Sequence, residues 1–117
     1  ALSLINTLSA MSIDVQARKA RLASVTGGLS GPAIRPLAVR MVWEAYKKVK
    51  IPIIGMGGIM DTPSALEFFI AGAAAVSIGT GNFVNPKTSI EVIDGLKAYL
   101  IKNKINSMQG LIGKLII

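Results

Sequence analysis

The stretch Ile51-Pro52-Ile53-Ile54-Gly55-Met56-Gly57-Gly58-Ile59 decides the fold of this chain. It reads as a short apolar strand that ends in a glycine-rich turn, and Pro52 sits near the strand start, where strands tolerate proline. Asp61 or Thr62 can cap a following helix, and Pro63 fits the first turn of that helix. The stretch therefore predicts one strand–turn–helix unit.

The same unit recurs on both sides of this stretch. Apolar runs at Leu2–Ile5 and Ala74–Ile78 read as strands, and helical spacing of apolar residues runs from Pro36 to about Val49 and from about Thr88 to Lys102. The strands are continuous apolar runs without alternation, which is typical of parallel strands covered on both faces. The order predicts an α/β fold with a parallel sheet.

Three other segments are less regular. Residues 8–26 read as a long loop that carries a short hairpin, and Thr26–Pro32 reads as a turn before a helix. Asn85-Pro86 breaks the chain before the helix at Thr88. Residues 107–117 read as a last helical segment.

Length and composition indicate a mostly interior piece of one domain, residues 1–117. Of the 117 residues 51% are hydrophobic and 16% are charged, against about 25% charged residues in ordinary soluble domains. No apolar run approaches the roughly 20 residues of a membrane span, and no signal-peptide pattern is present. Three strands cannot close a barrel and would leave two open edges, so we expect a piece that is incomplete alone.

The residue types exclude several kinds of chemistry. The chain has no cysteine and no histidine, so it supplies no disulfide, thiolate nucleophile, iron–sulfur ligand or Ser-His triad, and we expect no metal site. The net charge of +7 favours phosphate groups or an acidic partner, although a solvated lysine-rich surface also explains it. With 5% aromatic residues and scattered positive charges, we expect no nucleic-acid binding.

Glycine clusters precede the predicted helices. They are Gly27-Gly28-Leu29-Ser30-Gly31, Gly55-Met56-Gly57-Gly58 and Gly79-Thr80-Gly81. Glycine lets a backbone approach a ligand closely, and N–H groups at a helix start attract anions. The loops after the last two strands of a TIM barrel often hold a phosphate. The last two clusters, one βα repeat apart, therefore predict a phosphate site, although each alone can be an ordinary turn. Their spacing fits neither a Rossmann fingerprint nor a Walker loop.

A few polar residues complete the candidates. Asn6 and Thr7 close the first strand and offer paired donors and acceptors at a barrel mouth, or simply cap a turn. Lys19 and Arg35 lie near glycine loops and can meet a phosphate or point into solvent. No buried pair of carboxylates is evident, so we expect no catalytic base in this chain.

Four segments together resemble the C-terminal part of the class 1B dihydroorotate dehydrogenases. They are Ile5–Leu8, Thr26–Ile34, Ile51–Ile59 and Ile78–Phe83, in matching order and spacing within residues 2 to about 100. The Thr26–Ile34 segment points to class 1B over class 1A. The resemblance implies a TIM (β/α)₈ barrel, of which this chain would form about three βα units, strands 6 to 8.

The resemblance also implies function. The family oxidises dihydroorotate to orotate in pyrimidine biosynthesis and passes the hydride to FMN. Positions that match the family's FMN contacts are Ile5, Gly31, Gly57, Gly58, Gly79 and Thr80. Asn6 and Thr7 match the residues that bind the pyrimidine. The family's catalytic base is a cysteine in the earlier half of the barrel, so we expect this chain to be inactive alone.

The implied partners are the N-terminal half of the barrel, a subunit with FAD and an iron–sulfur cluster that delivers electrons to NAD, and further copies of the full protein. The implied location is cytoplasmic. Three alternatives stay open. They are a phosphate-binding TIM-barrel enzyme without flavin, a non-catalytic half-barrel fragment, and a related dihydropyrimidine dehydrogenase domain.

Overall fold

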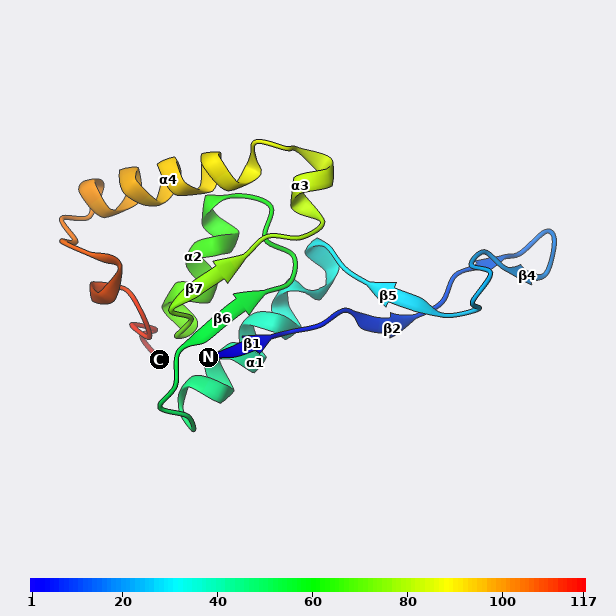
Figure 1. Ribbon diagram of the computed structural model, residues 1–117, viewed down its shortest axis with the longest axis horizontal. Coiled ribbons are helices and arrows are strands. Elements are labelled where there is room, and N and C mark those ends of the chain that lie inside the picture. The colour runs from blue at the N-terminus through cyan, green and yellow to red at the C-terminus, as the bar shows by residue number, and fades with distance from the viewer.

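The computed structural model describes all 117 residues. Its centre is a parallel sheet of three strands in the order β1 (Leu2–Leu4), β6 (Ile53–Met56) and β7 (Ala75–Ser77). Both pairs of neighbouring strands are parallel, which confirms the predicted α/β arrangement (Figure 1).

Helices follow the strands. The 3₁₀ helix η1 (Pro32–Ile34) leads into α1 (Arg35–Tyr46), α2 (Thr62–Ala71) follows β6, and α4 (Thr88–Lys102) comes after β7. Helices α1 and α2 pack against each other and lie on one face of the sheet, and α4 lies against α2 (Figure 1). The three long helices are those predicted. A short helix α3 (Gly81–Val84) was not predicted.

The boundaries of α2 follow from local chemistry. The Asp61 carboxylate accepts a 2.9 Å hydrogen bond from the Ser64 backbone N–H, and the Ser64 hydroxyl accepts from the Asp61 N–H at 3.0 Å. This reciprocal pair satisfies N–H groups that the helix start leaves free. Pro63 stands in the first turn and Gly72, with φ of 122°, ends the helix. The predicted cap, proline and terminating glycine are therefore confirmed.

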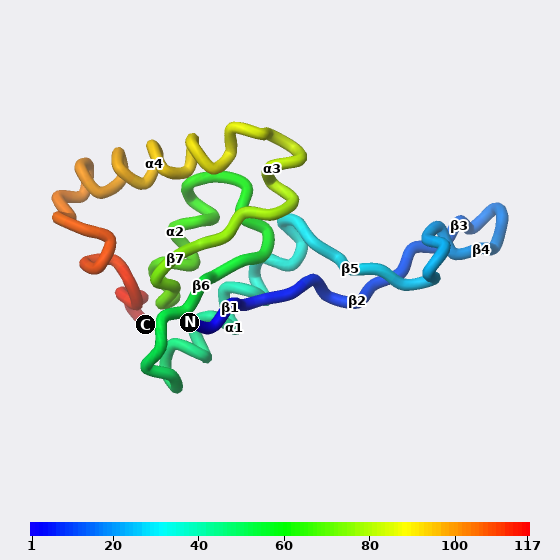
Figure 2. The backbone as a smooth tube through the Cα atoms, viewed as in Figure 1, coloured from blue at the N-terminus to red at the C-terminus, as the bar shows by residue number.

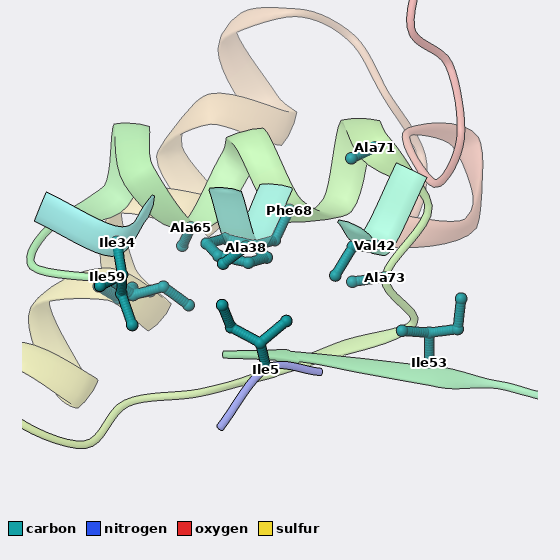
Figure 3. Packing of buried hydrophobic residues seen from close by; sticks show 11 residues of the cluster. Ile5, Ile34, Ala38, Val42, Ile53, Ile59, Ala65, Phe68, Ala71 and Ala73 are labelled. Carbon is teal, nitrogen blue, oxygen red and sulfur yellow. The ribbon is translucent and has the colours of Figure 1, made fainter. Parts of the chain in front are cut away.

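The core lies between the sheet and helices α1 and α2. Phe68 and Ala38 from the two helices are fully buried, and Ile53 of β6 faces them (Figure 3). Glycine at position 55 allows Phe68 to pack directly against the backbone of β6, because a Cβ there would stand 2.6 Å from the Phe68 ring. The helix-facing side of β6 is therefore the well-packed side of the sheet.

The opposite face of the sheet is uncovered. In register across the three strands lie Ser3, Ile54 and Ala75, and beside them Met56 and Ser77. Their side chains are exposed or half-buried, whereas the apolar strand sequences predicted cover on both faces. No element of this chain packs on that side, so the second face has no partner here.

The long loop is a two-part antiparallel ribbon that projects from the body (Figures 1 and 2). Strands β2 (Leu8–Ala10) and β5 (Gly27–Leu29) form its stem, and β3 (Ile13–Asp14) and β4 (Lys19–Ala20) form its tip. The predicted hairpin is confirmed. The turn predicted over Thr26–Pro32 is wrong for Gly27–Leu29, because pairing with β2 overrides the glycine signal.

The last predicted helix is also wrong. Residues 107–117 contain only the 3₁₀ turn η2 (Met108–Gly110). Gly113, with φ of 69°, donates a hydrogen bond to Phe69 at 3.0 Å. Leu111 is buried beside Leu66 and Phe69. Two glycines within four residues weaken a helix, and the segment packs instead as a strap on α2. None of the helices is both long and apolar enough to cross a membrane.

Candidate functional site

The candidate residues converge at one edge of the sheet. Because β1, β6 and β7 are parallel, their carboxyl ends meet at the same edge. Asn6 and Thr7 follow β1, Gly57 and Gly58 follow β6, and Gly79-Thr80 follows β7 by two residues. The parallel topology thus brings three predicted sites to one place.

The loop after β6 needs glycine at both positions. Gly57 has φ of 127° and Gly58 has φ of 75°, a region that side chains rarely adopt. A Cβ on Gly57 would stand 2.9 Å from the Ala38 Cβ, and a Cβ on Gly58 would stand 2.6 Å from the Gly31 carbonyl oxygen. Neither glycine N–H donates to an acceptor in the chain. The loop therefore presents two free donors.

The loop after β7 presents a second pair of donors. The N–H groups of Gly79 and Thr80 also have no acceptor in the chain. Gly79 differs from the β6 glycines, because no atom lies within 4 Å of the place of a Cβ. A hydrogen bond within the loop helps to fix its shape, since Asn82 Nδ2 donates to the Ile78 carbonyl at 2.7 Å. Open space beside free N–H groups suits a ligand that approaches the backbone closely.

A side-chain contact joins the β7 loop to the root of the ribbon. The Thr80 hydroxyl donates a 2.7 Å hydrogen bond to the Ser30 hydroxyl. Gly31, with φ of 85°, follows Ser30 and is the N-cap residue of η1. Sequence reasoning placed Ser30 only inside a glycine cluster and missed this role. A hydroxyl pair across 50 residues leaves no local signal in the sequence.

Charge near the β6 loop is balanced. A Cβ on Gly58 would stand 2.8 Å from the Arg35 Cβ, so Arg35 lies at the loop as predicted. Its Nε is 3.4 Å from the Glu67 carboxylate. Lys19 lies on β4 in the tip of the ribbon that also carries Gly27–Leu29, but away from the loops after β6 and β7 (Figure 2). It is therefore not placed to meet a phosphate at those loops.

Asp61 is the charged cap beside this loop. Hydrogen bonds from Ser64, first from its hydroxyl and then from its backbone N–H, lower the pKa of Asp61. The Arg35 charge acts in the same direction, and partial burial opposes the shift. Asp61 is therefore a structural cap, whose Oδ1 accepts both hydrogen bonds from Ser64.

Of the residues that follow β1, Ile5 is buried and Asn6 and Thr7 are exposed. The peptide bond between Leu4 and Ile5 is cis. Ile5 donates from its N–H to the Met56 carbonyl at 2.9 Å and buries its side chain towards the helices (Figure 3). Only its backbone can therefore face a ligand at the edge. Asn6 and Thr7 are exposed, and the Thr7 N–H donates to the Oδ1 of its neighbour Asn6 at 2.8 Å.

The acidic residues form neither a catalytic pair nor a metal site. Two of the glutamates pair with arginines, Glu67 with Arg35 and Glu44 with Arg40, and Glu91 accepts a hydrogen bond from Asn85. No group of three or more Asp, Glu, His or Cys lies together. The edge offers hydrogen-bond donors for an anion and polar groups for a small ligand.

Known proteins of one kind match this chain. The family model described as dihydroorotate dehydrogenase matches residues 1–100. A relative from Caldicellulosiruptor saccharolyticus, named dihydroorotate dehydrogenase B (NAD(+)), catalytic subunit, is 59% identical over 115 residues, 98% of this chain and 38% of the relative. A relative of the same name from Geotalea uraniireducens is 54% identical over 116 residues, which cover 99% of this chain and 38% of the relative.

A third relative of that name, from Thermodesulfovibrio yellowstonii, is 53% identical over 113 residues, which cover 97% of this chain and 37% of the relative. The chain therefore spans less than two fifths of the length of the relatives that it matches. The agreement in name and in coverage confirms the class 1B resemblance. The chain belongs to the dihydroorotate dehydrogenase family, as a segment that matches the NAD-linked B-type catalytic subunit.

Proposed function

We propose that this chain forms the part of an FMN-dependent dihydroorotate dehydrogenase that holds the FMN phosphate and one edge of the pyrimidine site. It would be one segment of a single barrel domain, strands 6 to 8. The whole enzyme would oxidise dihydroorotate to orotate in pyrimidine biosynthesis, in the cytoplasm. Family membership supports the reaction, and the geometry of the strand edge supports the role of this segment.

The observation that carries the proposal is that two loops at the same edge of the sheet each offer a pair of N–H donors without an acceptor in the chain. One pair comes from Gly57 and Gly58, and the other comes from Gly79 and Thr80. Backbone donors that converge on one place suit a phosphate, since they neutralise its charge without a titrating side chain. The open space at Gly79 leaves room for phosphate oxygens beside the backbone. These residues fit the phosphate group of FMN.

The remaining proposed contacts follow from position. The Ile5 backbone and Gly31 would border the flavin, because both lie at the same strand edge as the glycine loops. Asn6 would use its amide and Thr7 its hydroxyl to bind the pyrimidine. When bound, FMN supplies the electron acceptor, and the protein supplies binding, orientation and electrostatics. The catalytic base would come from the remaining barrel segment, because this chain has no cysteine or histidine.

Two further partners belong to the proposal. This chain would assemble with the remaining, N-terminal segment of the barrel, which would cover the open sheet face at Ile54 and Met56. We call this chain together with that segment the assembled barrel, whether the two are one polypeptide or two. An electron-transfer subunit would then carry electrons from FMN to NAD, in keeping with the relatives' name, and the full protein would form a homo-oligomer.

The test is the affinity of the assembled barrel for FMN and for riboflavin, measured by quenching of flavin fluorescence. Riboflavin lacks the phosphate, so the ratio of the two affinities isolates the phosphate site. We expect FMN to bind much more tightly than riboflavin. Equal affinities would contradict the phosphate site, and failure to bind either flavin would favour a barrel enzyme without flavin or a non-catalytic fragment.

A further inference from the structure

The Ser30-Gly31 dipeptide bridges the two donor pairs. On one side, the Gly31 carbonyl oxygen lies 2.6 Å from the place where a Cβ on Gly58 would stand. On the other side, the Ser30 hydroxyl accepts the 2.7 Å hydrogen bond from Thr80. The dipeptide thus touches the loop after β6 and the loop after β7 at once.

We infer that Ser30 is a positioning residue of the phosphate site, acting through Thr80. This inference rests on the proposed function, since it presumes that the four N–H groups bind one phosphate. The hydroxyl contact holds the β7 loop at a fixed place relative to the Gly31–Gly58 contact. The N–H groups of both loops then face the same ligand.

Apart from the Ser30 contact, the hydrogen bonds of the β7 loop are local, because they join residues 78–82 to partners within residues 78–89. Gly79 has no neighbouring atom at the place of a Cβ, and Thr80 makes no capping hydrogen bond to α3. The Gly79 and Thr80 carbonyls accept 3.0 Å hydrogen bonds from the N–H groups of Asn82 and Phe83. Asn82 Nδ2 also donates to the Ile78 carbonyl, and the Thr88 hydroxyl donates to the Gly81 carbonyl at 3.2 Å. Ser30 therefore supplies the side-chain hydrogen bond that ties this loop to the first glycine cluster.

The expected loss of FMN affinity is modest, because the Ser30 and Thr80 side chains are exposed. Both hydroxyls are accessible to water, which competes for the hydrogen bond when it breaks. Loss of one such bond should therefore lower the affinity for FMN by about three- to tenfold. The affinity for riboflavin should stay the same, because riboflavin places no phosphate at the four N–H groups.

The experiment compares Ser30→Ala with Ser30→Thr in the assembled barrel, with FMN and riboflavin as the two probes. We expect Ser30→Ala to lower the ratio of FMN to riboflavin affinity and Ser30→Thr, which keeps the hydroxyl, to restore it. Ser9→Ala is the matched control, because Ser9 is exposed on β2 and makes no side-chain hydrogen bond. Thermal unfolding of each variant checks that the fold is kept.

Other outcomes separate this inference from the proposed function. An unchanged ratio in Ser30→Ala, or an equal loss for both flavins, would overturn the positioning role and leave the FMN site standing. If the unmodified barrel bound neither flavin, the proposed function would fail and the inference with it. Should Ser30→Ala not fold, Thr80→Val removes the same bond from the other side. A ratio unchanged in Thr80→Val would equally overturn the inference.

Discussion

Gly58 lies against the carbonyl oxygen of Gly31, so closely that a Cβ on Gly58 would stand 2.6 Å from that oxygen. The two glycines belong to different glycine clusters of the sequence and have φ of 75° and 85°. Their contact places the root of the ribbon beside the loop after β6. It is the backbone contact around which the candidate phosphate site is arranged.

The contact predicts that Gly58→Ala destabilises the assembled barrel. The left-handed backbone alone should cost about 1 to 2 kcal/mol with a side chain, and the clash with Gly31 adds to this. The measurement is the free energy of unfolding in denaturant. Wild-type stability in Gly58→Ala would contradict the backbone geometry described for this loop.

Gly79→Ala is the complementary variant, because it separates binding from stability. Gly79 has an ordinary φ and open space around the place of its Cβ, so the fold should tolerate alanine. The new methyl group would occupy space proposed for the phosphate. We expect unchanged thermal unfolding and an affinity for FMN lowered by about tenfold or more, as for loss of about 1.4 kcal/mol of binding energy. An unchanged affinity for FMN would place the phosphate elsewhere.

The Asp61 cap predicts a pH dependence with a definite sign. Because hydrogen bonds from Ser64 lower the pKa of Asp61, its contribution to stability is present above the ordinary value of 3.8. It is lost as the pH falls through the lower, folded-state pKa. Asp61→Asn keeps a capping oxygen but does not titrate. The unfolding free energy of wild type minus that of Asp61→Asn should therefore fall on acidification below 3.8.

A difference that stays flat across this acid range would show that the cap does not depend on the Asp61 charge. Asp61→Ala removes the capping oxygen altogether and should cost about 1 kcal/mol near neutral pH. Comparison of the two variants separates the hydrogen bond from the charge.

The C-terminal strap should contribute to stability through Leu111. This side chain is 5% exposed and packs with Leu66 and Phe69, so Leu111→Ala should cost about 2 to 4 kcal/mol. Leu115 is 49% exposed, and Leu115→Ala is the matched control, with an expected change within about 0.5 kcal/mol. Chemical denaturation measures both. Equal effects of the two substitutions would mean that the strap does not pack as described.

The parts of the fold that local signals determine could be predicted from the sequence. Asp61, Pro63 and Gly72 define α2, because capping and helix termination depend on neighbours along the chain. The helix Thr88–Lys102 follows from apolar periodicity. The glycine loops could be assigned to the strand edge because parallel topology brings strand ends together. Their roles in binding FMN and pyrimidine remain predictions.

The parts that were missed depend on contacts between distant residues. Gly27–Leu29 forms a strand only because Leu8–Ala10 pairs with it. The segment after Lys102 is a strap because Leu111 packs against Leu66 and Phe69 of α2, a contact that no periodicity reveals. The hydrogen bond between Ser30 and Thr80 spans 50 residues. The uncovered face of the sheet could not be read from the strands, whose apolar sequences suit cover on both faces.

The central claim is that this segment serves a flavin-dependent oxidation of dihydroorotate. The most direct measurement is the visible absorption of FMN bound to the assembled barrel, recorded without oxygen before and after dihydroorotate is added. Our account predicts loss of the oxidised flavin bands on addition of dihydroorotate, with orotate formed in equal amount. Oxidised flavin bands that persist in the presence of excess dihydroorotate would contradict it.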